Sequence, residues 1–190
     1  MIFLSNVSFA YIILFILIYN GAVLVSKNKQ ILNWLLLVGS VLILNTIITF
    51  ESLGIVLFIS VGVFFTGKLL GSNPPKKRLY LNFSIGILII LFCLKNYNLG
   101  NFDLLQRVGL SYILFRLIHF LIDSSKQKIH DYNALSFLNY IIFFPTFMAG
   151  PIDEFNNFNY WIKQNHVIYR SPMLKAGLFK ITLGIVKNSF

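Results

Sequence analysis

Long apolar runs are the feature that most constrains what this chain can fold into. A helix needs about 20 largely apolar residues to cross the hydrocarbon core of a bilayer, and several such runs alternate with Lys, Asn, Gly and Pro. The composition agrees, since 57% of the 190 residues are hydrophobic and 12% are charged. A soluble domain of this length cannot bury so much apolar surface. The sequence therefore predicts one all-α membrane domain over residues 1–190, a polytopic transmembrane helical bundle.

Five helices are predicted before the first proline-rich stretch of the second half. We expect them at Val7–Val25, Ile31–Phe50, Leu53–Leu70, Leu79–Leu94 and Val108–Asp123. The third is predicted to be the weakest crossing, because Glu51 and Lys68 leave it a short apolar centre that favours a tilted or shallow position.

The basic residues are concentrated in alternate connections between these helices. The connections after the first, third and fifth helix hold most of them: Lys27, Lys29, Lys68, Lys76, Lys77, Arg78, Lys126 and Lys128. The positive-inside rule places these connections in the cytoplasm. We therefore expect a multi-pass protein of the cytoplasmic (inner) membrane with its N-terminus outside. The net charge of +10 is consequently explained by the orientation of the chain in the membrane, and it does not indicate a nucleic-acid partner.

The apolar run Phe137–Ile152 cannot be a straight spanning helix. Pro145 and the Gly150–Pro151 pair interrupt it, and proline lacks an amide donor and disfavours helix in the preceding residue. Breaks are therefore predicted at Phe144 and Gly150. Non-helical backbone at membrane depth must be sheltered by protein or must line a water-filled cavity. The sequence predicts a re-entrant or broken segment inside the bundle.

Two further segments follow the predicted break. Asn156–Lys175 carries Phe158, Tyr160 and Trp161 among polar residues, and it is either an interfacial helix or an aromatic-anchored loop. Ala176–Phe190 begins another apolar segment.

The fifth predicted helix carries ionisable residues that a lipid-facing helix would not tolerate. At 3.6 residues per turn, one stripe contains Gly109, Tyr112, Arg116, His119 and Asp123. We expect this stripe to face the bundle interior, with Arg116 paired to a carboxylate or to backbone carbonyls. Two roles for Arg116 remain open, namely holding an anionic substrate group and tying helices together.

Simple metal and nucleophile sites are not indicated. His119 and Asp123 supply two ligands, fewer than a catalytic zinc site needs. Ser111 projects from another face of the same helix, so it forms no triad with them. Cys93 is the only cysteine, and it is predicted to be a buried structural thiol. The residues indicate no metal and no cofactor.

Two motifs together resemble a known family. Gly-Leu-Ser-Tyr at 109–112, Phe115–Arg116 and Asp123 are followed by Phe-Phe-Pro at 143–145 and Gly-Pro-Ile-Asp at 150–153. This pair resembles the membrane-bound O-acyltransferases, in particular the bacterial branch responsible for teichoic acid D-alanyl transfer and alginate O-acetylation. The strong match covers roughly residues 108–158, and the earlier helices agree only in hydropathy and order.

The resemblance implies an acyltransferase acting across the membrane. A cytoplasmic carrier-protein thioester or acyl-coenzyme A would donate a D-alanyl or acetyl group, and a cell-envelope polymer such as teichoic acid or an exopolysaccharide would accept it. Residues expected to line or brace the central tunnel are Tyr112, Arg116, His119, Asp123, Pro145, Gly150, Pro151 and Asp153.

The same resemblance leaves the catalytic step unassigned. The family's catalytic histidine lies in a later helix, and His119, His130 and His166 do not match it. We therefore expect the chain to be the N-terminal portion of an acyltransferase and to be inactive alone. The alternative is a non-enzymatic membrane component, such as part of a transporter or flippase, whose polar pathway the stripe lines. Internal repeats would favour that alternative, and the sequence shows none.

Overall fold

The computed structural model describes residues 6–26, 28–96, 110–129, 132–147 and 153–163, all of which lie in helices or their connections. The helices, in chain order, are α1 (Asn6–Val25), α2 (Lys29–Asn45), α3 (Phe50–Gly71), α4 (Lys77–Asn96), α6 (Leu110–Ser125), α7 (Ala134–Ile142), α8 (Phe144–Phe147) and α9 (Phe155–Lys163). The described residues contain no strand, which confirms the predicted all-α fold.

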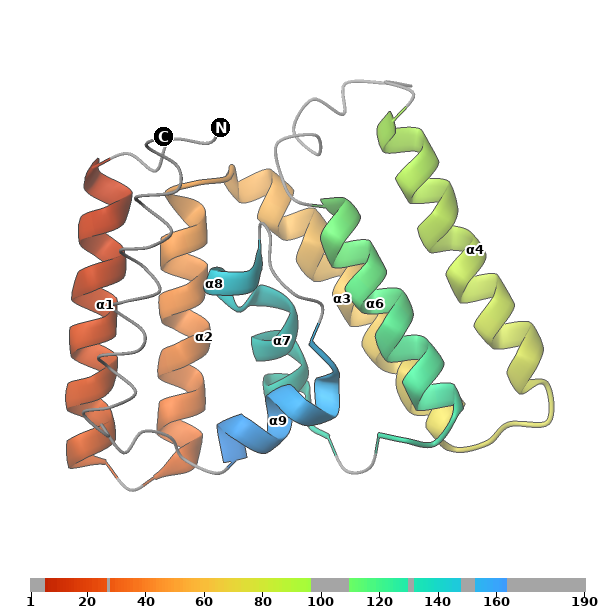
Figure 1. The fold of residues 1–190 in the computed structure, drawn as a ribbon. Helices are drawn as coiled ribbons and strands as arrows, with labels where there is room; N and C mark the ends of the chain where they lie inside the picture. Colours follow the sequence, from red (N-terminus) through yellow and green to blue (C-terminus); the bar gives the residue numbers. More distant parts are fainter. Residues whose placement is uncertain (1–5, 27, 97–109, 130–131, 148–152, 164–190) are drawn as a thin grey trace, which may run out of the picture.

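The long helices stand side by side around two short ones. Figure 1 shows α1 and α2 at one end of the row, α4 at the other, and the adjacent pair α3 and α6 between α4 and the short helices. Helix α7 packs against α2, α3 and α6, while α6 packs against both α3 and α4. The short helices therefore occupy the middle of the bundle, and α1 and α4 form its rim.

Helix α3 corrects the prediction that the third crossing is the weakest. It has 22 residues, and it is the one described helix with both the length and the composition to cross a membrane; the apolar stretches Ala10–Val25 and Lys29–Asn45 are shorter. Glu51 lies in its first turn and Lys68 in its last. Both charges therefore sit at the ends, where they also complement the helix dipole, and the apolar centre between them is long.

The connection between α2 and α3 lies earlier than predicted. Helix α2 ends at Asn45, and Phe50, predicted to end it, begins α3 instead. The Thr46 hydroxyl donates to the Ile43 carbonyl at 2.7 Å, and the Thr49 hydroxyl caps the new helix by accepting from the Ser52 amide. The two threonines thus end one helix and begin the next within a run of residues whose hydropathy predicts a single helix.

The segment containing Pro145 is broken, as predicted, although the break lies one residue earlier. Phe143 ends α7 with φ −52° and ψ 105°, and Phe144 already begins α8. A continuous helix would drive the proline ring into the Ile141 carbonyl. Breaking at Phe143 moves Pro145 into the first turn of a new helix, where its missing amide is not needed. The predicted break at Gly150 lies outside the described residues.

The broken segment has a re-entrant shape. In Figure 1, α7 rises from one end of the bundle, α8 lies part-way along α2, and α9 lies back at the end where α7 begins. Helix α9 packs against α7, and the Lys29 ammonium at the start of α2 donates to the Lys163 carbonyl at 2.9 Å. The region predicted to be an interfacial helix or a loop is thus helical to Lys163, and Tyr160 and Trp161 are exposed on it.

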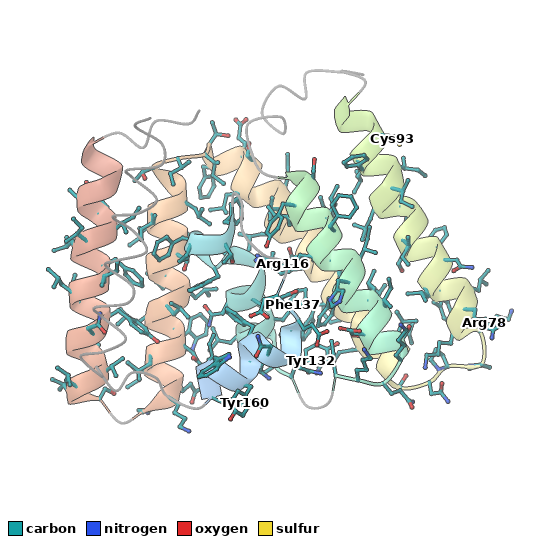
Figure 2. The ribbon with its side chains drawn as sticks, viewed as in Figure 1. Arg78, Cys93, Arg116, Tyr132, Phe137 and Tyr160 are labelled. Carbon is teal, nitrogen blue, oxygen red and sulfur yellow. The ribbon has the colours of Figure 1, made fainter. Side chains whose placement is uncertain are left out.

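Aromatic rings fill the space where these helices converge. Phe120 of α6 lies 4.6 Å from Phe137 of α7 and 5.4 Å from Phe155 of α9, between ring centroids. Figure 2 places Phe137 and Tyr132 in this central region. Phe120, Phe137 and Phe155 are each at most 1% exposed. This cluster fixes α6, α7 and α9 against one another next to the helix break.

Candidate functional site

Arg116 is the largest fully buried side chain of the described residues, with 1% of its surface exposed. It sits near the middle of α6, and in Figure 2 it lies at the centre of the bundle where α6 faces α7 and α8. A guanidinium has five N–H donors and keeps its charge in proteins. Burying it without partners would be very costly, so its contacts define the candidate site.

The partners of Arg116 are backbone carbonyls and hydroxyls on both sides of the helix break. Nη1 donates to the Tyr140 carbonyl at 2.8 Å and to the Ile141 carbonyl at 3.5 Å. Nη2 donates to the Thr146 carbonyl at 3.0 Å, to the Thr146 hydroxyl at 2.9 Å and to the Tyr112 hydroxyl at 3.1 Å. One side chain thereby joins α6, the end of α7 and the end of α8.

These contacts follow from the chemistry of the break. In an uninterrupted helix the Ile141 carbonyl would accept from the amide of residue 145, but residue 145 is proline and has no N–H. The Tyr140 carbonyl likewise loses its helical partner when α7 ends at Ile142. Arg116 supplies donors to both carbonyls, and its positive charge complements the negative end of the α7 dipole.

Two tyrosines flank the guanidinium. The Arg116 Cζ lies 4.9 Å from the ring centroid of Tyr112 and 5.1 Å from that of Tyr140, distances at which a ring face attracts a cation. The Tyr140 hydroxyl also donates to the Asp153 carbonyl at 2.8 Å. Arg116, Tyr140 and Asp153 are therefore connected, and the residues before and after the break are held together.

The C-terminal end of the α6 stripe forms a second polar group. Asp123 is 5% exposed, with the His119 Nδ1 3.5 Å from Oδ2 and the Lys128 Nζ 3.7 Å from Oδ1. Lys128 lies in the connection after α6 and was not among the predicted site residues. In that connection, burial raises the pKa of the Tyr132 phenol to about 12. Tyr132 therefore stays neutral at physiological pH.

The predicted residues thus divide into two groups and a remainder. Tyr112 and Arg116 meet at the break beside Pro145, and Asp153 joins them through Tyr140; His119 and Asp123 lie further along α6. Gly150 and Pro151 lie outside the described residues. In the described ranges, no three His, Cys, Asp or Glu side chains come together as a metal site would require.

Sequence reasoning missed Tyr140 and Thr146, although both contact Arg116. The signal was present, because Tyr140 lies one turn before the break and Thr146 directly follows Pro145. A helix interrupted by proline leaves carbonyls open near the interruption. The buried cation on α6 is their natural partner, so the two features of the sequence explain each other.

Cys93 differs from the predicted buried thiol. It is exposed on the rim helix α4, where Figure 2 shows it towards the end of the helix. The apolar residues around Cys93 predicted a buried side chain. Helix α4 lies at the rim of the bundle, however, so many of its apolar side chains are exposed.

Comparisons with known proteins give the same family as the motifs. The family model of the membrane-bound O-acyltransferases matches residues 3–189. A teichoic acid D-alanyltransferase of Streptococcus thermophilus is 37% identical over 60 residues, which are 32% of this chain and 14% of the relative. A teichoic acid D-alanyltransferase of Lacticaseibacillus rhamnosus is 30% identical over 91 residues, which are 46% of this chain and 22% of the relative.

The alignments with these two relatives span less than a quarter of each relative's length. No solved structure gives a significant match to the chain. The family model, in contrast, extends over nearly the whole sequence. The chain belongs to the membrane-bound O-acyltransferase family.

Proposed function

We propose that this chain forms part of an enzyme that transfers an acyl group to a cell-envelope polymer, with D-alanyl transfer to teichoic acid as the best-supported case. The observation that carries the proposal is the broken segment held by Arg116, because it is the part of the chain in which the motifs of the resemblance meet. The two relatives are named for this activity. An acyl donor on the cytoplasmic side and a polymer acceptor on the other side are the implied partners.

The geometry supports a reaction across a thinned barrier. Helix α7 has nine residues, so it rises only about 13 Å, less than half of a hydrocarbon core of about 30 Å. Beyond it the backbone turns at Phe143. A donor entering beside α7 would therefore need to reach only part-way across the membrane to meet an acceptor. In this proposal Arg116, Tyr112 and Thr146 keep the thin region in shape.

The proposal includes a multi-pass position in the cytoplasmic membrane with the N-terminus outside. The basic connections after α1, α3 and α6 lie at one end of the bundle in Figure 1, which is the end where α9 returns. Single thiols introduced by Lys128→Cys and Asn45→Cys, in a Cys93→Ser background, test the orientation. A membrane-impermeant maleimide should label residue 45 in intact cells and residue 128 only after permeabilisation. The reverse pattern would contradict this orientation.

Acyl transfer is tested in a bacterium that lacks its own teichoic acid D-alanyltransferase. The chain is expressed alone and together with the part of the Streptococcus thermophilus relative that follows the aligned region, and ester-linked D-alanine on teichoic acid is measured by mass spectrometry. We expect ester only in the co-expressing strain, because the family's catalytic histidine has no counterpart among His119, His130 and His166.

Two control variants make this experiment decisive. Arg116→Leu should abolish the ester, while Arg78→Leu on the rim should preserve it. Ester formed by the chain alone would support acyl transfer but overturn the expectation that the chain lacks its catalytic group. Absence of ester in every combination, with both polypeptides present in the membrane, would overturn the proposed function.

A further inference from the structure

A cavity of about 440 Å³ lies between α1, α2, the end of α7 and α9. None of the groups that bond Arg116 lines it. Two aliphatic side chains complete a wall made mainly of four aromatic side chains and one carboxylate, which are Tyr19, Phe143, Asp153, Phe158 and Trp161. This combination of aromatic side chains and a single carboxylate restricts which ligands the cavity can hold.

The carboxylate in this cavity is fixed in position. Asn157 Nδ2 donates to Asp153 Oδ1 at 2.6 Å, and Trp161 Nε1 donates to Asn157 Oδ1 at 3.1 Å. Asn157 and Trp161 are four residues apart and lie on one face of α9, and Asp153 stands two residues before this helix begins at Phe155. The Tyr140 hydroxyl holds the Asp153 backbone carbonyl at 2.8 Å. The acid is thus oriented by Asn157 of α9 and by Tyr140 of α7 before any ligand arrives.

Asp153 also differs from the other half-buried or buried acid of the described residues. Asp123 has the Lys128 ammonium near one oxygen and the His119 imidazole near the other. No described cationic side chain forms such a pair with Asp153. Lys29 and Lys163 meet at the opposite end of α9, beyond a nine-residue helix that rises about 13 Å. At that distance their charges are largely screened.

The aromatic side chains suit a cation rather than an anion or a neutral polar group. Aromatic faces attract ammonium groups, and several rings around one cation form the cages that bind alkylated ammonium ligands. Phe143 and Phe158 pack with ring centroids 5.5 Å apart and planes at 65°. This edge-on arrangement keeps the two rings rigid, and Trp161 contributes an exposed ring on the same helix as Phe158.

We infer that this cavity binds an organic ammonium group, with Asp153 as the counter-ion and the aromatic side chains as the surrounding cage. A D-alanyl ester carries such a primary ammonium next to its acyl carbon, so the cavity would recognise the amino end of the acyl group; this assignment rests on the proposed function. The ammonium headgroup of a membrane lipid has the same chemistry and is the other source to be tested.

The binding test uses the full chain in a non-ionic detergent at neutral pH. The chain has two tryptophans, so Trp34→Phe leaves Trp161 as the fluorescent reporter in the cavity wall. D-Alanine methyl ester is titrated against methyl lactate, which replaces the ammonium with a hydroxyl. We expect saturable quenching by the amine and at least about tenfold weaker binding of the lactate, as one desolvated cation contact implies. Equal binding of both esters would overturn the inference.

A matched pair of variants tests Asp153 itself. Asp153→Asn keeps the oxygen that accepts from Asn157 and removes the charge, and it should weaken amine binding by about tenfold or more. Glu154→Gln removes one charge from the exposed neighbouring residue and should leave binding within about twofold, since exposed charges contribute little. Equal weakening by both would overturn the inference. If Asp153→Asn fails to fold, Phe158→Leu provides the second test. Unchanged amine binding by the Phe158→Leu variant would contradict the proposed role of the aromatic side chains.

Phosphoethanolamine and phosphocholine separate the two ammonium sources. Tighter binding of D-alanine methyl ester supports the acyl-group source, whereas tighter binding of a headgroup supports the ammonium site and overturns its assignment to the D-alanyl group. Binding is measured without acyl transfer. Selective amine binding together with absent ester in the cellular experiment would therefore retain the ammonium site and reject the proposed function, while the opposite result would reject only the site.

Discussion

Helices α4 and α6 are neighbours of similar length, yet they place their apolar side chains in opposite ways. On α4, Phe83 is 70% exposed and Ile90 is 59% exposed, whereas on α6 Phe120 is fully buried and Arg116 is 1% exposed. The helix that carries an arginine, a histidine and an aspartate is central, and the helix with an uncharged middle is on the rim. Apolar content therefore does not decide which helix is buried.

The difference follows from the solvent. Hydrocarbon accommodates apolar side chains as well as a protein interior does, so there is little hydrophobic force to bury them. An ionisable group in hydrocarbon is expensive unless protein groups pair with it. The polar residues of α6 consequently determine its position, and α4 can face lipid because it places no such group at its centre.

The largest expected effect comes from removing the buried cation. Arg116→Leu leaves the carbonyls of Tyr140, Ile141 and Thr146 without its donors, and each buried acceptor left unpaired costs about 1–3 kcal/mol. We expect a loss of about 3–5 kcal/mol, enough to unfold a marginal protein. The loss of stability is measured by heating the purified chain in detergent and monitoring the remaining folded protein by size-exclusion chromatography. Arg78→Leu on α4 is the matched control, and equal loss in both variants would contradict the central role of α6.

Close packing of α3 against α6 gives the next largest effect. A Cβ added at Gly67 would lie 2.6 Å from the ring of Phe120 and 3.0 Å from the Tyr132 hydroxyl, while one added at Gly62 would meet nothing within 4 Å. Phe120 cannot yield easily because other rings surround it. Gly67→Ala should therefore cost about 1–3 kcal/mol by overpacking, and Gly62→Ala should be neutral or slightly stabilising. The same denaturation assay compares them, and a tolerated Gly67→Ala would show that α6 can move.

A smaller effect is expected at the link between α7 and α9. Tyr140→Phe keeps the ring beside Arg116 and removes the hydroxyl that donates to the Asp153 carbonyl. Loss of one such bond should cost about 0.5–1.5 kcal/mol. Tyr80→Phe on the exposed side of α4 is the control and should leave stability unchanged. Limited proteolysis near residue 153 should become faster only in the Tyr140 variant; unchanged cleavage would contradict this link.

The smallest effect is expected on the lipid-facing side of α4. Ile90→Ala removes an exposed side chain, and surface substitutions of this kind usually stay within about 0.5 kcal/mol. The midpoint of thermal denaturation in detergent should therefore not change measurably. A loss comparable to that of Gly67→Ala would mean that the outer face of α4 packs against protein, which would remove the contrast between the two helices.

Much of this architecture was predictable from the sequence. The helical stripe on α6 indicated an inward face, and Pro145 indicated a break in the following segment. The errors arose where local polar contacts override hydropathy. Thr49 caps the start of α3 inside an apolar run, and the break after α7 lies at Phe143 instead of Phe144. Such details depend on hydroxyl caps and on the clash between a proline ring and a particular carbonyl, which apolar periodicity does not report.

By itself, the sequence determined that the chain would be a bundle of apolar helices with a charged stripe and a proline break. The apolar helices, the stripe and the break each depend on the spacing of residues within one local segment of the chain. Only the tertiary structure decided that Arg116 meets Tyr140, Ile141 and Thr146, residues 24 to 30 positions away. It also decided that Asp123 is paired with Lys128 and His119, whereas Asp153 lines an aromatic cavity. The physical reason is that a buried polar group is stabilised by whichever partners the packing of other helices brings within hydrogen-bond distance.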